Sequence, residues 1–229
     1  MSASPSRRLE ILSPGLLSYE EGLRLQRQLA EERAVGARPD TLILLEHPPT
    51  ITLGRSARGE NVLYPVEMLS SRGVDIHHCD RGGDVTFHGP GQLVAYPIVS
   101  LEGSRCSVRG YMRDLEEVMI RCCKDHGVAA GRKPGMIGAW IGGDDPADPW
   151  RKIGAAGVHI SRWITTHGLA LNVSVDLDYF SLINPCGITE HPITSLAAEL
   201  KPAHPPSLRE VSERLIEHFS EIFGVEPSA

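Results

Sequence analysis

The stretch Arg81-Gly-Gly-Asp-Val-Thr-Phe-His-Gly-Pro-Gly-Gln92 places a short β-forming run between two glycine-rich segments. Residues 85–88 have the β-branched and aromatic composition of a strand, whereas Gly82-Gly83 and Gly89-Pro90-Gly91 interrupt regular strand pairing. Glycine also permits tight turns and lets a ligand approach the backbone closely. The stretch therefore predicts a strand flanked by loops that line a cleft.

Further strand and helix signals lie on both sides of this stretch. Ser107 can cap a helix, and Ser207-Leu-Arg-Glu210 is a capping box. Because strands come in consecutive runs with helices before, between and after them, the sequence predicts an α+β fold, a mixed β-sheet with packed helices in one domain over residues 1–229. The expected strands are 41–45, 50–53, 74–79, 85–88, 92–99, 137–141, 153–160 and 164–175, and the expected helices are 18–35, 107–126 and 207–224.

The composition narrows the class of protein. With 229 residues, 41% of them hydrophobic, the chain can bury a full core. A formal charge of −6 without a basic stripe argues against a nucleic-acid partner. No segment approaches the ~20 apolar residues of a membrane span, and five cysteines without regular spacing indicate no disulfide framework. We therefore expect a soluble, cytoplasmic protein with no nucleic-acid or membrane partner.

Two later segments add a lysine and a cysteine. Lys152-Ile-Gly-Ala-Ala-Gly157 sets an amine beside small residues, and Asn184-Pro-Cys-Gly-Ile188 puts the Cys186 thiol in a tight bend. A thiolate attacks thioesters, and a nearby ammonium lowers the thiol pKa from ~8.5 and can exchange protons with the reacting groups. The combination suggests covalent acyl transfer. The residues alone leave open that Cys186 is an inert buried side chain and that Lys152 faces solvent.

The histidines give weaker signals. His88 and His167 could each bind a substrate or satisfy a buried carbonyl. His77, His78 and Cys79 come nearest to a metal cluster, but adjacent strand residues point to opposite faces, so we expect no metal site. The sequence offers no local evidence for the orienting base of a Cys–His hydrolase. It also lacks the two common phosphate-cradling motifs.

Three signatures resemble, in order, those of the lipoyl(octanoyl) transferase family, within the wider group of biotin/lipoate protein ligase-like catalytic domains. They are Arg81-Gly-Gly-Asp-Val-Thr-Phe-His-Gly-Pro-Gly-Gln-Leu-Val-Ala-Tyr96, then Lys152-Ile-Gly-Ala-Ala-Gly157 with His167-Gly-Leu-Ala-Leu-Asn172, and finally Pro185-Cys-Gly-Ile188 with Thr194-Ser-Leu196. The resemblance covers about residues 42–200. Each signature alone is weak, and the three together are specific.

The resemblance implies transfer of octanoyl from octanoyl-acyl carrier protein to a lysine of a lipoyl domain, the first step of endogenous lipoate biosynthesis. The implied acceptors are the lipoyl domains of 2-oxoacid dehydrogenase E2 subunits and glycine cleavage H protein, and no cofactor or metal is implied. Cys186 would carry the acyl group as a thioester, and Lys152 would stabilise the thiolate and take the proton of the incoming amine. The matching substrate-binding positions are Arg81, Gly82, Gly83, Asp84, Val85, Thr86, Phe87, His88, Ala155, Ala156, Gly157, Gly168, Leu169 and Ala170, with Tyr96 and His167 as possible pocket residues.

Two other functions stay open at this point. An ATP-dependent lipoate or biotin protein ligase on the same fold would need an adenylate-binding loop and would not need Cys186. A non-catalytic lipoyl-domain or acyl-binding module would form no covalent adduct. The acidic loop at 142–149 is long for the family and could change how Lys152 is presented or how a partner docks.

Overall fold

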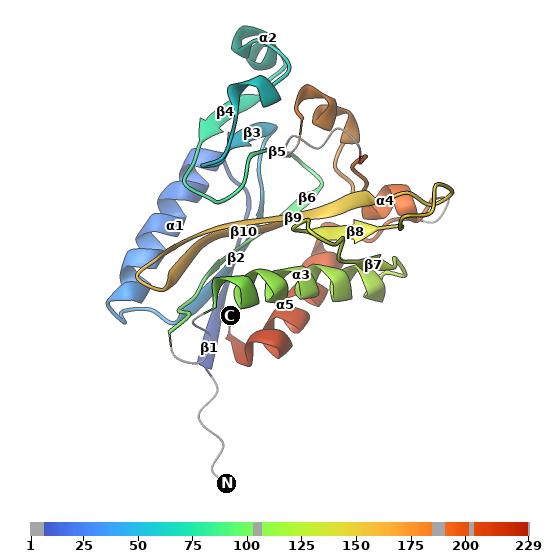
Figure 1. Ribbon diagram of the computed structural model, residues 1–229. Helices are drawn as coiled ribbons and strands as arrows, with labels where there is room; N and C mark the ends of the chain where they lie inside the picture. The colour runs from blue at the N-terminus through green and yellow to red at the C-terminus, as the bar shows by residue number, and fades with distance from the viewer. Residues whose placement is uncertain (1–6, 103–106, 185–190, 202–203, 229) are drawn as a thin grey trace.

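The computed structural model describes residues 7–102, 107–184, 191–201 and 204–228. Its strands form an eight-stranded sheet in the order β11-β1-β2-β6-β10-β9-β8-β7 and a three-stranded sheet in the order β4-β3-β5 (Figure 1). The strands are β1 (Arg7–Leu16), β2 (Asp40–Glu46), β3 (Thr50–Leu53), β4 (Asp75–His78), β5 (Val85–His88), β6 (Gln92–Ile98), β7 (Ala130–Gly131), β8 (Ala139–Ile141), β9 (Arg151–Ser161), β10 (Ile164–Asn172) and β11 (Val225–Ser228). The helices are α1 (Tyr19–Ala34), α2 (Val66–Ser71), α3 (Val108–Asp125), α4 (Leu196–Glu199) and α5 (Leu208–Phe223), with 3₁₀ turns at Gly59–Asn61 and Leu177–Leu182.

The large sheet is mixed and covered on both faces. β1 runs parallel to β2 and β11, whereas β6 is antiparallel to β2 and β10, and β9 is antiparallel to β10. Helices α3 and α5 lie on one side of the sheet and α1 on the other (Figure 1). Along β2, Leu42 and Leu44 join the core that contains α3 and α5, while Ile43 and Leu45 join the core that contains α1. The predicted α+β fold with a mixed sheet and packed helices is confirmed.

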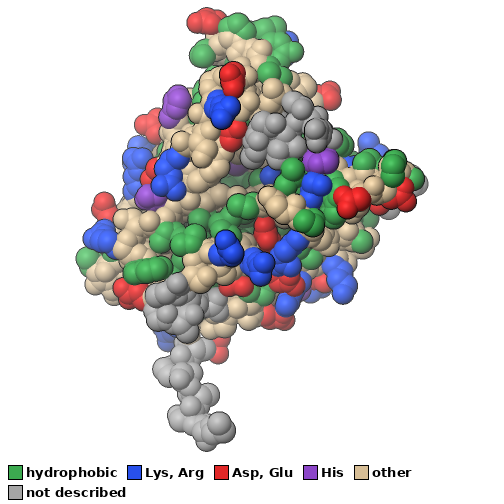
Figure 2. Space-filling view, in the orientation of Figure 1, with side chains coloured by type: hydrophobic (Ala, Val, Ile, Leu, Met, Phe, Trp, Pro, Cys, Tyr) green, Lys and Arg blue, Asp and Glu red, His purple; other side chains and the backbone are tan. Residues whose placement is uncertain are grey.

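The three long helices begin where the sequence predicts. Ser18 and Ser207 form reciprocal capping boxes at the start of α1 and α5, and the Ser107 hydroxyl accepts a hydrogen bond from the Gly110 N–H at 3.0 Å. Gly224 ends α5 in the left-handed conformation, with φ at 60°. In the described part of the chain, no helix has the length and apolar composition needed to cross a bilayer. On the face shown in Figure 2, acidic and basic side chains are interspersed.

A tight hairpin brings β9 and β10 together. Arg162 and Trp163 both have positive φ, 50° and 60°, which is the two-residue turn that matches the twist of paired strands. The resulting register sets Gly157 opposite Gly168 and Ala155 opposite Ala170. Two small-residue segments that the sequence singles out separately thus become neighbours on one sheet surface.

The small sheet has a core of its own. β3 pairs with β4 in parallel and with β5 in antiparallel fashion, and α2 packs beside them. The Phe87 ring stacks on Tyr179, with ring centroids 4.9 Å apart, and meets Phe180 edge-on. The loop that precedes β5 reaches the large sheet, where the Gly82 N–H donates to the Val158 carbonyl at 2.9 Å. The two sheets therefore approach each other at the glycine-rich stretch.

The structure differs from the sequence-based prediction at several strands. β2 and β3 follow one another in sequence but belong to different sheets, because the chain passes between sheets at His47-Pro48-Pro49. β1, β7 and β11 are additional strands. The strand pattern of β1 is broken by Ser13-Pro14-Gly15, where its register with β2 shifts. The strand expected at 137–141 starts only at Ala139, and the one expected from residue 153 already starts at Arg151.

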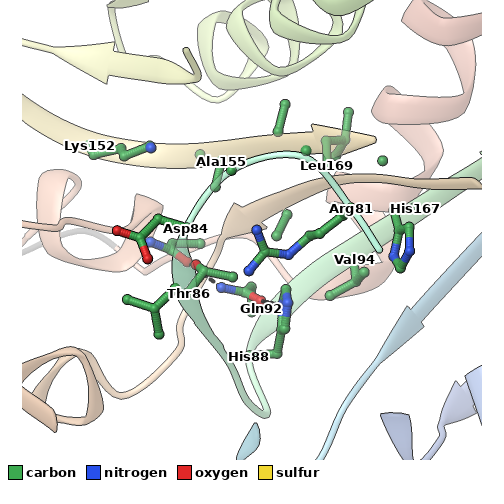
Figure 3. A pocket seen from close by; sticks show the side chains of 18 of the residues that line it. Arg81, Asp84, Thr86, His88, Gln92, Val94, Lys152, Ala155, His167 and Leu169 are labelled. Carbon is green, nitrogen blue, oxygen red and sulfur yellow. Dashed lines mark hydrogen bonds between the residues drawn. The ribbon is translucent and has the colours of Figure 1, made fainter. Parts of the chain in front are cut away.

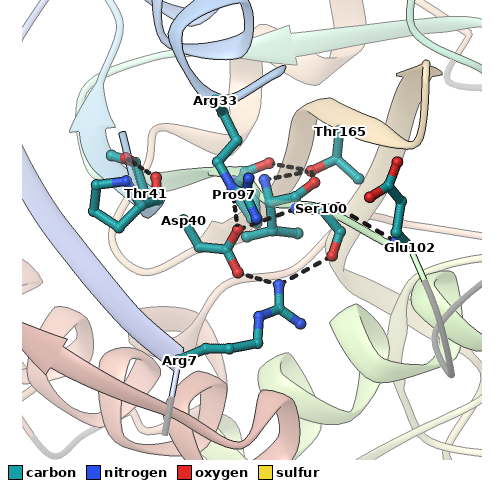
Figure 4. A network of polar contacts seen from close by, with 10 residues as sticks. Arg7, Arg33, Asp40, Thr41, Pro97, Ser100, Glu102 and Thr165 are labelled. Carbon is teal, nitrogen blue, oxygen red and sulfur yellow. Dashed lines mark hydrogen bonds and ion pairs between the residues drawn. The ribbon is translucent and has the colours of Figure 1, made fainter. Parts of the chain in front are cut away.

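One buried carboxylate ties several of these elements together. The Asp40 side chain at the start of β2 is 2% exposed and forms ion pairs with Arg7 of β1 and Arg33 of α1, the latter at 2.8 Å. It also accepts the Ser100 N–H at 3.1 Å, and Arg7 donates to the Ser100 carbonyl (Figure 4). The network therefore links β1, β2, α1 and the chain that follows β6.

Candidate active site

A pocket lies where the two sheets meet (Figure 3). β9 and β10 of the large sheet contribute residues 154–157 and 167–170 to one wall, and the loop before β5 with β5 itself contributes residues 81–86 to the other. Tyr19, the first residue of α1, and Phe180 complete the lining near the small sheet. The pocket is therefore built from segments that are far apart in the sequence.

Most of the predicted site residues line this single pocket. They come from four strands and one loop. The signatures that contain them are separated in the sequence, and the fold brings them together. They are Arg81, Gly82, Gly83, Asp84, Val85, Thr86, His88, Tyr96, Lys152, Ala155, Ala156, Gly157, His167, Gly168, Leu169 and Ala170.

Two predicted residues stand apart from this set. Phe87 is buried in the core of the small sheet, against Tyr179 and Phe180, and is not among the described residues that line the pocket. Its neighbours on β5, Thr86 and His88, do line it, as expected where successive strand residues alternate between faces. Cys186 lies outside the described residues.

The glycines of the pocket wall allow neighbouring elements to pack closely against β9 and β10. A Cβ atom on Gly157 would come within 2.8 Å of the Gly82 carbonyl oxygen, and one on Gly154 within 2.6 Å of the Met119 sulfur of α3. A Cβ atom on Gly168 would lie 2.6 Å from Pro97 Cδ of β6. The methyl group of Ala155 remains for the apolar wall, because its neighbour Ala156 packs against the core on the other face of the sheet.

Lys152 lies near the start of β9, beside the chain that follows the Cys186 segment. Its N–H donates to the Pro192 carbonyl and its carbonyl accepts the Thr194 N–H, both at 2.9 Å. Its ammonium lies 5.3 Å from the centre of the buried Trp140 ring, within the range of a cation–π contact. A side chain on Gly138 would collide with Lys152 Cε, so the lysine stem is confined between β8 and the pocket.

The described residues on both sides of the Cys186 segment are anchored at the pocket. The Asn184 N–H donates to the Asn61 carbonyl at 2.8 Å, and the Asn61 amide donates to the Asp84 carboxylate at 2.5 Å. On the other side, Ile193 forms a bridge with Lys152 and lines the pocket. Asn184 is therefore held beside the glycine-rich loop, and Ile193 is held beside Lys152.

Arg81 extends from the loop before β5 into the pocket, beside Gly157 of β9 (Figure 3). One of its terminal nitrogens donates to the Thr52 carbonyl at 2.8 Å and to the Thr52 hydroxyl at 2.9 Å, and the other donates to the Gly82 carbonyl at 3.2 Å. All three acceptors are neutral. These bonds join β3 of the small sheet to the loop that covers β9.

Buried histidines beside the pocket are held neutral. Burial lowers the pKa of His47 to about 4 and that of His88 to about 3. His47 bonds to the Leu17 carbonyl at 2.7 Å and to the Tyr96 hydroxyl at 2.8 Å, and His88 bonds to the Gln92 side chain at 2.7 Å. At neutral pH these rings are hydrogen-bonding groups without charge.

His167 occupies an unusual position in the pocket wall. Its backbone has φ at 57°, which is strained for a residue other than glycine, and its N–H donates to the Gln26 side chain of α1 at 2.7 Å. Its Nε2 bonds to the Asp80 carboxylate at 2.7 Å. Burial lowers the pKa of His167 even though Asp80 acts in the opposite direction.

Two residues at the pocket carry no signal in the sequence. Tyr19 lines the pocket and Thr52 holds Arg81, yet neither has a local pattern that predicts this. Gln92 and Asn172 lie within the signatures but are not among the predicted site residues. Both line the pocket, and Gln92 bonds to His88 and to Asn172. Among the described residues, no group of three or more His, Cys, Asp or Glu side chains could hold a metal ion.

Residues 18–220 match the family model described as the lipoyl protein ligase A/B catalytic domain. A protein of Chloroflexus aurantiacus named octanoyltransferase is 49% identical over 222 residues, which cover 96% of each chain. An octanoyltransferase of Myxococcus xanthus is 47% identical over 212 residues, or 93% of this chain. The chain spans only 58% of the length of that second relative.

The fold is similar to that of a solved structure from an archaeal lipoylation system of Thermoplasma acidophilum, a bipartite lipoate protein ligase with its E2 lipoyl domain. The TM-score is 0.69 at 18% sequence identity, over 97% of this chain and 86% of that one. At this identity the likeness concerns the fold alone.

Proposed function

Because this chain belongs to the lipoyl protein ligase A/B catalytic domain family, as its three signatures predict, we propose that it is an enzyme that transfers octanoyl groups in lipoate biosynthesis. Relatives between 44% and 49% identical over nearly the whole chain are named octanoyltransferase. We further propose that the donor is octanoyl-acyl carrier protein and that the acceptor is a lysine of a lipoyl domain.

The shape and lining of the pocket support a linear acyl substrate. Ala155 of β9 lies opposite Ala170 of β10, and their methyl groups form a strip of small apolar side chains with Val94 beside them. Burial of hydrocarbon on such a strip is favourable by roughly 0.8 kcal/mol per methylene group. Lys152 lies at one end of the strip, so the reactive carbonyl of the donor belongs at that end.

In the first half of the reaction, Cys186 acts as the nucleophile. Its thiolate attacks the thioester carbonyl of the donor, a new carbon–sulfur bond forms, and the bond to the carrier thiol breaks. The Lys152 ammonium favours the thiolate before attack and gives its proton to the departing thiol. The products of this half are the acylated Cys186, a neutral Lys152 and the free carrier thiol.

In the second half, the acceptor lysine displaces Cys186. Neutral Lys152 takes a proton from the incoming ammonium, and the resulting amine attacks the acyl carbon. The amide forms, the bond to Cys186 breaks, and one proton goes to solvent. Cys186 returns to the thiolate and Lys152 to the ammonium, so no nucleotide is consumed.

The main support for this proposal is the position of the residues that flank the Cys186 segment relative to Lys152. Lys152, the apolar strip and Ile193, which follows the Cys186 segment, line the same pocket, and Asn184 before that segment is bonded to the loop beside Asp84. The described residues on either side of the Cys186 segment therefore lie at the lysine end of the pocket, which supports the proposed pairing of Cys186 with Lys152.

The acylated Cys186 can be detected directly. After incubation with octanoyl-acyl carrier protein, intact-mass measurement is expected to show one octanoyl adduct, and peptide mapping to assign it to Cys186. Cys186→Ala should form no adduct, whereas Cys122→Ala should acylate normally because Cys122 is buried between α3 and α5 and its pKa is raised to about 12. An adduct that maps to Cys79, Cys106, Cys122 or Cys123 would refute the proposal.

A further inference from the structure

The pocket has a second cationic group at the end away from Lys152. Lys152 and Gly157 are five residues apart on β9, which corresponds to about 17 Å along an extended strand. A Cβ atom on Gly157 would lie 3.5 Å from Arg81 Cδ. The apolar strip thus runs between two cationic side chains, with Lys152 near one end and Arg81 near the other.

Arg81 is buried without an acidic partner. Its residue is 8% exposed, and no carboxylate of the described residues forms an ion pair with it. Its bonds to Thr52 and Gly82 use three of the five N–H groups of a guanidinium, and Nε has no hydrogen-bond partner in the described part of the chain. A buried charge of this kind is costly unless an opposite charge and further acceptors complete its surroundings.

The one carboxylate among the described residues that line the pocket is bonded elsewhere: Asp84 accepts the Asn61 amide at 2.5 Å. A neighbouring tyrosine adds a further donor. Tyr19 also lines the pocket, is 2% exposed, and its hydroxyl finds no hydrogen-bond partner among the described residues apart from the weakly interacting Cys79 thiol nearby. Burial raises the pKa of Tyr19, so the hydroxyl keeps its proton. His88, the ring next to Tyr19, is neutral. Two unused donors, one of them cationic, therefore lie buried beside the pocket at this end.

We propose that Arg81 and Tyr19 form a carboxylate-binding site for linear medium-chain acids. The hydrocarbon chain of the acid lies on the apolar strip and points toward Lys152. The guanidinium supplies the opposite charge and the two unused N–H and O–H groups supply hydrogen bonds. This orientation is the reverse of that of an acyl donor, whose carbonyl lies at Lys152. A bound acid therefore occupies the acyl site and excludes the donor.

Calorimetric titration of the whole protein with sodium octanoate and with octanamide separates charge recognition from chain burial. Both ligands have the same chain, and only octanoate carries a charge. We expect wild-type protein to bind octanoate at least about tenfold more tightly, in line with a charge-assisted hydrogen-bonded pair. Equal affinities for the two ligands would overturn the proposal. The measurement needs no acyl transfer, so it is independent of the proposed reaction.

Variants assign the preference to Arg81 rather than to Lys152. Arg81→Met should reduce the preference for octanoate to within about twofold while octanamide still binds. Lys152→Met should keep the preference, and Arg55→Met is the matched control because Arg55 is exposed on the neighbouring loop. Loss of the preference in Lys152→Met, with retention in Arg81→Met, would place the carboxylate at the other end and contradict the proposal.

A measurement on wild-type protein covers the case in which Arg81→Met fails to fold. Nuclear Overhauser contacts of bound octanoate are expected between its C2 protons and the Tyr19 ring, and between its terminal methyl group and Lys152. The opposite pattern would overturn the reversed orientation. Tyr19→Phe, which removes only a hydroxyl, should weaken octanoate binding severalfold and leave octanamide binding unchanged.

The same carboxylate could come from a free fatty acid or from the far end of a dicarboxylic acyl thioester. Suberoyl-pantetheine and octanoyl-pantetheine, compared as ligands, distinguish these sources. Tighter, Arg81-dependent binding of suberoyl-pantetheine identifies the dicarboxylic thioester. An Arg81-dependent preference seen only with octanoate identifies the free acid. A preference that is absent in both comparisons, or independent of Arg81, refutes the site.

Discussion

Lys152 and Ile193 lie opposite each other in a parallel bridge at the edge of the pocket. Backbone hydrogen bonds of 2.9 Å on either side, to Pro192 and from Thr194, hold the start of β9 against the chain that follows the Cys186 segment. This pairing uses only main-chain groups. Changes to the Lys152 side chain should therefore test its chemistry without undoing the architecture around it.

We predict that Lys152→Ala slows octanoyl transfer by several orders of magnitude while circular dichroism and the melting temperature stay near those of wild type. The variant removes both thiolate stabilisation and the proton acceptor for the incoming amine. Lys152→Arg should restore little activity, because guanidinium keeps the charge and cannot act as a base near neutral pH. Turnover near the wild-type rate in Lys152→Arg would show that only the charge matters.

Octanoyl transfer is expected to proceed without ATP or a metal ion, because a thioester donor is already activated. The assay measures modification of a lipoyl domain by octanoyl-acyl carrier protein after apyrase and chelator treatment. The comparison mixture contains free octanoate, ATP and magnesium. If only the second mixture modifies the lipoyl domain, the protein is a ligase and the covalent role of Cys186 is wrong.

Gly168→Ala should destabilise the fold by about 2 kcal/mol or more, since the added methyl group would overlap the Ala95 carbonyl and lie 2.6 Å from Pro97 Cδ. Urea denaturation measures the loss. Gly143→Ala is the matched control, because nothing lies within 4 Å of a Cβ at that position. Equal stability of the two variants would mean that β10 and β6 can move apart at no cost.

Asp40→Asn should lower the free energy of unfolding by roughly 1–3 kcal/mol, because the variant keeps a side chain of the same shape and leaves Arg7 and Arg33 without their shared carboxylate. Glu32→Gln, which weakens the half-buried ion pair with Arg38, should cost less than about 1 kcal/mol, because both side chains remain partly in contact with solvent. Thermal denaturation at low and high salt compares them. A larger effect in Glu32→Gln would argue against the importance of the buried network.

Stability should fall on acidification partly through His47. Burial lowers the pKa of its imidazole from 6.5 to about 4, so between these values the unfolded chain binds a proton that the folded chain does not. This contribution reduces stability by up to about 1.4 kcal/mol per pH unit as the pH falls through that window, and it vanishes above pH 7. His47→Gln should show a shallower slope from pH 6.5 to 4 despite lower stability at pH 7. Parallel slopes would contradict the assignment.

Local features of this protein are set by residues close together in the sequence. Ser18, Ser107 and Ser207 each meet an N–H three residues ahead, so the helix starts follow from short segments. The Arg162-Trp163 turn and the glycines around Val85–His88 likewise act within a few residues. The three signatures carry enough of this information to identify the family and to predict Lys152 and the small-residue wall.

Only the tertiary structure decided which surfaces these segments share. β2 and β3 are adjacent in sequence but join different sheets, and β1 becomes an interior strand although Ser13-Pro14-Gly15 breaks its pattern, because strand pairing depends on burial against distant partners. The same long-range packing removes Phe87 from the pocket, brings Tyr19 into it, and buries Arg81 against neutral oxygens. Whether a buried charged side chain has a carboxylate partner is decided by the folded chain, since its neighbours come from segments tens of residues away.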